Sequence, residues 1–266
     1  MRDISKRFPG VLALDNVSLS IERGEVHALL GENGAGKSTL MKILSGAYKK
    51  DAGEIIFDGQ PVQINSPRQA QELGVSIIYQ ELNLVPQLSV AENIFLSSLP
   101  MKNPACIDWK RVYSDAQTII DSLEVDINVR SRISSLGIAQ QQMVEIAKAL
   151  NHQAKVIVMD EPSANLDSDA MVRLGALLYR LKEAGHTILL SEHRFHYVCD
   201  SFDRLVFMEN GEISAIYSRS EALSLTEAQF AVMGLRLFQP PSFQVGGAFL
   251  SKPEDTLQVS KISCML

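Results

Sequence analysis

A glycine-rich segment near the N-terminus has the residue types and spacing of a phosphate-binding loop. Residues 31–38 fit the pattern G-x-x-x-x-G-K-[ST] and follow a short apolar run at 26–30. Glycines let backbone N–H groups converge on phosphates without side-chain clashes, and a helix beginning there adds its positive N-terminal end. We expect Lys37 to reach the β- and γ-phosphates and the Ser38 hydroxyl to ligate Mg²⁺. The predicted nucleotide-binding residues of this segment are Gly31, Glu32, Asn33, Gly34, Ala35, Gly36, Lys37, Ser38 and Thr39.

A pair of adjacent acids supplies the other half of a nucleoside triphosphate site. Asp160 and Glu161 follow the apolar run 156–159, and ligands of open parallel sheets bind at the carboxyl ends of strands. We expect Asp160 to hold the Mg²⁺ shell and Glu161 to act as general base on a water in line with the γ-phosphate. A base beside the metal ligand, without a recognisable acceptor-substrate motif, favours a hydrolase over a kinase.

The elements that must position these residues alternate between strands and helices. Strand-like apolar runs lie at 26–30, 53–59, 75–79, 156–159, 187–190 and 205–208. Helices are predicted at 38–44, after a Ser89–Glu92 capping box, from about Asp108, at 137–150 and in a segment ending at Gly185. An Asn210-Gly211 pair predicts a hairpin turn. This alternation predicts an α/β core with a helical insert at about 88–150.

Composition excludes several classes of protein. The 266 residues are 46% hydrophobic, which is enough apolar material for a sizeable core. A formal net charge of −6 argues against nucleic acid as the main partner. No apolar run approaches the roughly 18 residues of a membrane-spanning helix, and the first residues lack the apolar stretch of a signal peptide. The three cysteines lack metal-ligand spacing and are interpreted as ordinary thiols.

Further motifs share the order and spacing of one family. The chain resembles the nucleotide-binding subunit of ATP-binding cassette (ABC) transporters from its first residue to about residue 234. By this resemblance Gln80 falls in the Q-loop, which ligates Mg²⁺ and meets the membrane partner. His193 matches the switch histidine that contacts the γ-phosphate, and Phe8 matches the aromatic residue that stacks on adenine. The segment that resembles the D-loop consists of Ala164, Asn165, Leu166 and Asp167.

The signature motif of the family is altered in this chain. The usual Leu-Ser-Gly-Gly-Gln aligns with Leu136, Gly137, Ile138, Ala139 and Gln140. Gly137 replaces the serine whose hydroxyl would bind the γ-phosphate, and Ala139 replaces the second glycine. In such cassettes ATP lies between the phosphate-binding loop of one unit and the signature of the other. The resemblance therefore implies asymmetric sites: this chain's altered signature weakens the ATP site of its partner.

Two kinds of importer share features with the sequence. Residues 8–11, 81–96 and 141–148 are similar to cassettes of ribose/galactose-type monosaccharide importers. Residues 161–167 and 191–194 look more like energy-coupling-factor cassettes for vitamins or metal ions. The similarity to monosaccharide importers is weighted more heavily, because the segment after Gln80 faces the membrane partner in the family. Two further hypotheses compete with an importer: a soluble ABC ATPase of translation or DNA repair, and a fragment that binds nucleotide without hydrolysis.

The resemblance implies a complete set of expectations. The fold is expected to be a P-loop NTPase cassette with a mainly parallel sheet core, an N-terminal antiparallel β subdomain and the helical insert. The function is a Mg²⁺-dependent ATPase that uses ATP to drive uptake of a small solute, with Ser38, Gln80 and Asp160 at the metal. Expected partners are a second cassette (a homodimer or tandem partner), transmembrane permease subunits and, indirectly, a periplasmic or extracellular solute-binding protein. The expected location is peripheral, on the cytoplasmic face of the cell membrane.

The expected domain boundaries follow composition and pattern. Residues 1–238 form the cassette, and 239–256, with its proline and glycine pairs, is interpreted as a linker. Residues 257–266 are a candidate start of a second cassette, because 259–264 can be laid over the opening residues 1–6.

Overall fold

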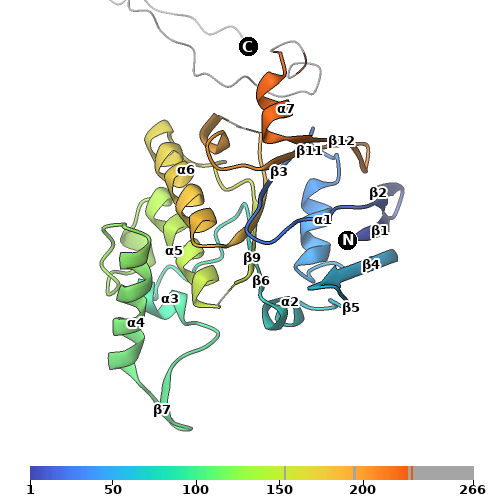
Figure 1. Cartoon of the computed structure of the whole chain (residues 1–266). Coiled ribbons are helices and arrows are strands. Elements are labelled where there is room, and N and C mark those ends of the chain that lie inside the picture. Colours follow the sequence, from blue (N-terminus) through green and yellow to red (C-terminus); the bar gives the residue numbers. More distant parts are fainter. Residues whose placement is uncertain (153, 194–195, 227–228, 230–266) are drawn as a thin grey trace, which may run out of the picture.

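A sheet of six strands lies at the centre of the described part of the chain, in the order β12-β11-β3-β10-β9-β6 (Figure 1). The computed structural model describes residues 1–152, 154–193, 196–226 and 229. The strands are β3 (Val26–Leu30), β6 (Val75–Ile78), β9 (Val156–Asp160), β10 (Thr187–Ser191), β11 (Arg204–Glu209) and β12 (Glu212–Ser218). All neighbouring pairs are parallel except β11 and β12, which form the hairpin that the Asn210-Gly211 turn predicts.

The central strands are apolar because both faces of the sheet are covered. Every residue of β3 and β10 is buried, as is usual in parallel sheets packed on two sides. Alternate residues of β9 belong to two separate hydrophobic clusters: Ile157 and Met159 to one, and Val158 to the other. Figure 1 shows α1 (Lys37–Leu44) on one side of the sheet, and α5 (Ile138–Asn151) and α6 (Ser168–Glu183) on the other. The strands that carry the site residues are therefore packed between two hydrophobic clusters, one on each face of the sheet.

A second, antiparallel sheet lies beside α1. Its described strands are ordered β2-β1-β4-β5: β1 (Arg2–Phe8), β2 (Val11–Val17), β4 (Ala52–Phe57) and β5 (Gln60–Val62). The Asp58-Gly59 pair turns the chain from β4 to β5, with positive φ values of 50° and 78°. Positive φ at both central residues suits the tight two-residue turn of a β-hairpin. A short helix, α2 (Pro67–Leu73), then leads into β6.

The helices between β6 and β9 begin at local caps that the sequence predicts. This segment contains α3 (Val90–Ile94), the hairpin β7 (Met101–Asn103) and β8 (Cys106–Ile107), α4 (Trp109–Ser122), the 3-10 turn η1 (Ile133–Ser135) and α5. The capping box of α3 is present: Glu92 N donates to Ser89 Oγ at 3.2 Å and Ser89 N donates to Glu92 Oε2 at 2.8 Å. Asp108 caps α4. The β7–β8 hairpin has no counterpart in the sequence-based prediction.

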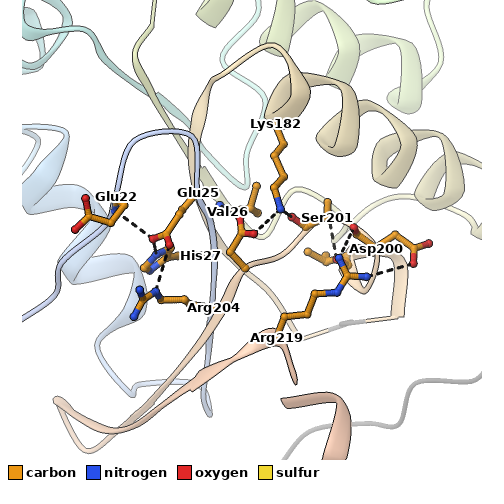
Figure 2. Close-up of polar contacts among 11 residues, drawn as sticks. Glu22, Glu25, Val26, His27, Lys182, Asp200, Ser201, Arg204 and Arg219 are labelled. Carbon is orange, nitrogen blue, oxygen red and sulfur yellow. Dashed lines mark hydrogen bonds and ion pairs between the residues drawn. The ribbon is translucent and has the colours of Figure 1, made fainter. Parts of the chain in front are cut away.

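Ion pairs hold the amino ends of the central strands (Figure 2). Asp203 accepts from Val26 N at 2.9 Å, and Lys182 of α6 donates to the same carboxylate at 2.5 Å. Beside them Glu25 lies 2.9 Å from His27 Nε2 and 3.5 Å from Arg204 Nε. These contacts fasten β3, β11 and α6 at the end of the sheet remote from the site described next.

The remaining described elements are the 3-10 turn η2 (His196–Val198), which follows β10, and the helix α7 (Arg219–Ser224), which follows β12. The expected boundary at residue 238, the linker 239–256 and the candidate start of a second cassette at 257–266 lie outside the described residues.

Candidate nucleotide site

The glycine-rich loop connects β3 to α1, the context that a phosphate-binding loop requires. Gly31 has φ 148° and Gly36 has φ 101°. A Cβ on Gly31 would lie 2.2 Å from the Met208 carbonyl oxygen, and a Cβ on Gly36 would lie 2.6 Å from the Ala13 carbonyl oxygen. Both distances are too short for any side chain, so the path of the loop depends on glycine at these two positions. The exposed Glu32, Asn33 and Gly34 form the tip of the loop, and Ala35 is buried beneath it.

Lys37 is folded back over this loop. Its Nζ donates to the carbonyl oxygens of Gly31 at 2.6 Å and Glu32 at 3.0 Å, and the side chain is buried. Burial lowers the pKa of Lys37, while the nearby carboxylates of Glu161 and Asp160 oppose that shift. Among the described residues, the direct hydrogen-bond partners of the ammonium group are therefore these carbonyl oxygens, which it is placed to exchange for phosphate oxygens.

Asp160 is the last residue of β9, and two hydroxyl groups converge on it. Ser38 Oγ donates to Asp160 Oδ1 at 3.0 Å and Ser191 Oγ donates to the same oxygen at 2.7 Å. Ser191 faces Asp160 because β10 pairs with β9 in parallel register at these two residues. Thr39 follows Ser38 in the first turn of α1 and is half-buried.

The three residues expected at the metal line one cleft. Ser38, Gln80 and Asp160 border a cavity of about 470 Å³ together with Lys42, Tyr79, Glu81 and Asn83. Hydroxyl, amide and carboxylate oxygens are the hard donors that suit Mg²⁺, and the small number of protein donors leaves room for water and phosphate oxygens. The donor set therefore fits a magnesium ion held jointly with a nucleotide.

Glu161 adopts a left-handed backbone conformation, with φ 49°. Its N–H donates to the carbonyl oxygen of Ser191 at 3.1 Å and to Ser191 Oγ at 3.2 Å, which holds this uncommon geometry. Its Oε1 lies 2.8 Å from His193 Nε2. The two side chains are 20% and 37% exposed, so the pair is open to the solvent side of the site. The sequence-predicted base and switch histidine are in direct contact.

A buried carboxylate, Glu192, lies directly before His193, the predicted switch histidine. It accepts from Ser163 N at 3.0 Å, Ser163 Oγ at 2.8 Å, His193 N at 3.2 Å and the Tyr197 hydroxyl. Sequence reasoning assigned no role to Ser191 or Glu192. The available signal was two polar residues at the end of an otherwise apolar strand, placed next to the strand that carries the two acids.

The predicted Q-loop is fastened to α5. Asn83, three residues after Gln80, donates its N–H to Glu145 Oε1 at 2.7 Å, and its carbonyl oxygen accepts from Lys148 Nζ at 3.2 Å. Burial raises the pKa of Glu145, an effect that Lys148 and the Asn83 N–H partly offset. The predicted Q-loop therefore has one end in the cleft lined by Ser38 and Asp160 and the other on α5, the helix that begins within the predicted signature segment.

The predicted D-loop turns tightly after Glu161. Ala164 N donates to the Glu161 carbonyl oxygen at 3.1 Å. Asn165 is exposed, whereas Leu166 is buried in the core cluster. Asp167 caps α6 by accepting from Ala170 N at 2.8 Å. The loop thus passes directly from the predicted base to the start of a core helix.

Phe8 and the signature segment lie outside this polar cluster. Phe8, at the end of β1, makes an edge contact with Tyr48, with ring centroids 5.4 Å apart, and Lys42 of α1 lies over the Tyr48 ring. Gly137 forms the N-cap of α5 and is exposed, as is Ile138. Within the described ranges, no hydrogen bond or ion pair joins the segment 136–140, which includes Leu136, Ala139 and Gln140, to the glycine-rich loop.

Comparison with known proteins decides the family. The ABC transporter family matches residues 14–164, more than half of the chain. This chain is a member of the ABC transporter family. It is 48% identical over 213 residues to a ribose import ATP-binding protein of Rubrobacter xylanophilus, covering 80% of this chain and 42% of that protein. It is 43% identical over 212 residues to a galactose/methyl galactoside import ATP-binding protein of Salmonella typhimurium, covering 80% of this chain and 42% of that protein.

Solved structures of the family share the fold. A nucleotide-free ATP-binding cassette from an ABC transporter is 28% identical, with a TM-score of 0.74 over 87% of this chain and 92% of that chain. The cbiO1 protein of Clostridium perfringens, part of the transporter complex cbiONQ, is 26% identical, with a TM-score of 0.74 over 85% of this chain and 90% of that chain. The predicted α/β cassette, with a mainly parallel core and an antiparallel subdomain, is confirmed.

Two further findings bear on this ABC family member. The chain spans about two fifths of the length of the import ATP-binding proteins named above. Among its described residues, none of the helices is long and apolar enough to cross a bilayer.

Proposed function

We propose that this chain binds and hydrolyses Mg²⁺-ATP as the cassette of an ABC importer and thereby drives uptake of a monosaccharide. The observation that carries the proposal is the convergence of Lys37, Ser38, Asp160, Glu161 and His193 at the carboxyl ends of β3, β9 and β10. These residues come from separate segments of the chain, and their types match binding, metal ligation and proton transfer.

Binding would begin at the glycine-rich loop. The loop amides and the N-terminus of α1 face the phosphates, and Lys37 exchanges its bonds to the Gly31 and Glu32 carbonyl oxygens for bonds to phosphate oxygens. Ser38, Gln80 and Asp160 would hold Mg²⁺, which supplies electrostatic stabilisation of the phosphates when bound. Phe8 would stack on the adenine ring.

Hydrolysis would depend on the contact between Glu161 and His193. Glu161 accepts a proton from a water as the water oxygen attacks the γ-phosphorus, and the bond from that phosphorus to the ADP oxygen breaks. His193 Nε2 lies 2.8 Å from Glu161, so the imidazole can orient this carboxylate and turn to a γ-phosphate oxygen. The positive φ of Glu161 directs the acid out of the strand line towards the site.

A second cassette would complete each ATP site, because in the family ATP lies between the phosphate-binding loop of one unit and the signature of the other. Gly137 offers no hydroxyl to a γ-phosphate, so the site that receives this signature would be weaker than the site built on a Leu-Ser-Gly-Gly-Gln partner. The loss of one hydrogen bond to a charged acceptor is worth about 1.5–3 kcal/mol. We therefore expect unequal nucleotide sites in the pair, with the D-loop residues 164–167 near the shared interface.

The transported solute is inferred from the named relatives. Identities of 43–48% to ribose and galactose import ATP-binding proteins favour a monosaccharide as the solute. Permease subunits and a solute-binding protein would carry the sugar, with this chain peripheral on the cytoplasmic face of the membrane.

The test is ATP binding and phosphate release by the purified chain, with Lys37→Ala as the critical variant and Lys49→Ala, an exposed lysine, as the matched control. We expect Lys37→Ala to lose ATP binding and Lys49→Ala to retain both activities. Micromolar ATP affinity in Lys37→Ala would contradict the assigned loop. Sugar-dependent stimulation of the ATPase in vesicles containing the co-purified permease tests the solute, and stimulation by a vitamin instead would overturn it.

A further inference from the structure

Glu192 is a buried carboxylate at the point where two functional loops meet. The residue is 2% exposed. Its Oε1 accepts from Ser163 N and from the Tyr197 hydroxyl, and its Oε2 accepts from Ser163 Oγ and from His193 N. These donors belong to the loop after β9, the residue after Glu192 itself and the 3-10 turn η2. One side chain therefore joins three short segments at the edge of the nucleotide site.

Both loops that Glu192 joins carry residues of the proposed reaction. Ser163 lies two residues after Glu161 and begins the turn into the D-loop, where Leu166 N donates back to the Ser163 carbonyl oxygen at 3.1 Å. His193 contacts Glu161 at 2.8 Å. Burial of a carboxylate is unfavourable unless hydrogen bonds compensate for the lost water. An apolar side chain here would leave the Ser163 and His193 N–H groups without this acceptor, so Glu192 ties the two loops together.

We propose that Glu192 is a positioning residue for ATP hydrolysis, which fixes the His193 backbone and the start of the D-loop in one geometry around Glu161. The inference rests on the proposed ATPase function. A shift of His193 when the γ-phosphate leaves would then be transmitted to the D-loop through Glu192, because both loops share its carboxylate.

The decisive variant is Glu192→Gln. Among the described residues, each carboxylate oxygen of Glu192 receives one backbone N–H, from Ser163 at Oε1 and from His193 at Oε2. The amide of glutamine has one oxygen and one NH₂ group, so whichever way it lies, one of these backbone donors faces another donor. Hydroxyl groups can rotate to adapt, but backbone N–H groups cannot. The substitution keeps the size of the side chain and disrupts one of the two tethers.

A matched control is available at the other end of the sheet. Glu25 also accepts a backbone N–H, from Glu22, and contacts His27 and Arg204 (Figure 2). Both the Glu22 N–H and His27 Nε2 use the same oxygen, Oε2, so the single oxygen of glutamine can serve both. Glu25→Gln therefore removes a carboxylate charge at a site remote from the nucleotide.

Two measurements on the full chain test the proposal. In steady-state hydrolysis of Mg²⁺-ATP, Glu192→Gln should lower kcat about tenfold or more with KM within about twofold of wild type. Glu25→Gln should change neither constant. Tyr197→Phe, which removes one donor and keeps the ring, should lower kcat less than Glu192→Gln and in the same direction. Hydrogen exchange without nucleotide should be faster at the Ser163 and His193 amides in Glu192→Gln and unchanged there in Glu25→Gln.

A small or non-specific effect of Glu192→Gln on kcat would overturn the proposal. A kcat within about twofold of wild type in Glu192→Gln, or equal losses of kcat in Glu192→Gln and Glu25→Gln, would overturn the positioning role. If Glu192→Gln does not fold, the test uses Tyr197→Phe instead. A kcat of this variant within about twofold of wild type would then overturn the positioning role. Absence of hydrolysis when the wild-type chain is assembled with a second cassette would refute the proposed ATPase function, and unchanged exchange at Ser163 and His193 would separately refute the tether.

Discussion

Removal of the Ser191 hydroxyl should weaken the metal side of the site without altering the fold. Ser191 is fully buried, and its Oγ donates to Asp160 Oδ1 at 2.7 Å. In Ser191→Ala this oxygen of Asp160 keeps the Ser38 hydroxyl at 3.0 Å. The Glu161 N–H keeps the Ser191 carbonyl oxygen at 3.1 Å. The substitution therefore removes one hydrogen bond to a carboxylate, about 1.5–3 kcal/mol, and the weaker of the two acceptors shared by the Glu161 N–H.

If the whole loss of the bond to Asp160 is felt in the transition state, kcat/KM for ATP falls by about 10- to 150-fold. The assay is phosphate release by Ser191→Ala over a range of Mg²⁺ concentrations, where we also expect half-maximal activity at higher Mg²⁺. Ser45→Ala is the control, since Ser45 is equally buried and its hydroxyl donates only to the Lys42 carbonyl oxygen at 3.2 Å. An unchanged Mg²⁺ dependence and a kcat/KM within about twofold of wild type would refute the role given to Ser191.

Three other perturbations have outcomes that the structure specifies. Gly36→Ala should abolish ATP binding, because its Cβ would lie 2.6 Å from the Ala13 carbonyl oxygen; Gly34→Ala, with no atom within 4 Å, should bind ATP more weakly than wild type but measurably. Equal affinities in an equilibrium dialysis experiment would be inconsistent with this. Burial lowers the pKa of His27 below its ordinary 6.5, so the unfolded chain binds more protons than the folded chain as the pH falls below that value. Thermal unfolding should therefore show a larger loss of stability from pH 7 to pH 5 in wild type than in His27→Gln, and identical losses would contradict it. Gly137→Ser should raise hydrolysis in the assembled transporter, because Gly137 has φ −68° at a helix N-cap and open space for a side chain; an unchanged rate would argue against asymmetric sites.

Local sequence was sufficient for the parts of the site that depend on short-range spacing. The strand–loop–helix context of Lys37, the acids at the end of β9 and the capping box at Ser89 each involve a few consecutive residues. Their backbone requirements, such as positive φ at glycine and an oxygen at an N-cap, are properties of the residue types themselves. For that reason these predictions agree with the structure closely.

Contacts between segments that are far apart in the sequence could not be predicted from local sequence. Ser191 meets Asp160 only because β10 pairs with β9, and Glu192 meets Ser163 only because the loops after these strands lie side by side. The contacts of Asn83 with Glu145 and Lys148 likewise depend on how α5 packs beside β6. The β7–β8 hairpin was missed because its strands are two and three residues long, too short for an alternating pattern.

The central claim is that Glu161 is the general base of an ATPase, and the most direct measurement compares ATP binding and phosphate release in wild type and Glu161→Gln. Glutamine keeps the size of the side chain and its contact with His193 but cannot accept the proton of the attacking water. We predict unchanged ATP affinity and a rate of phosphate release at least about 100-fold below wild type. Phosphate release by Glu161→Gln at the wild-type rate would contradict the assignment.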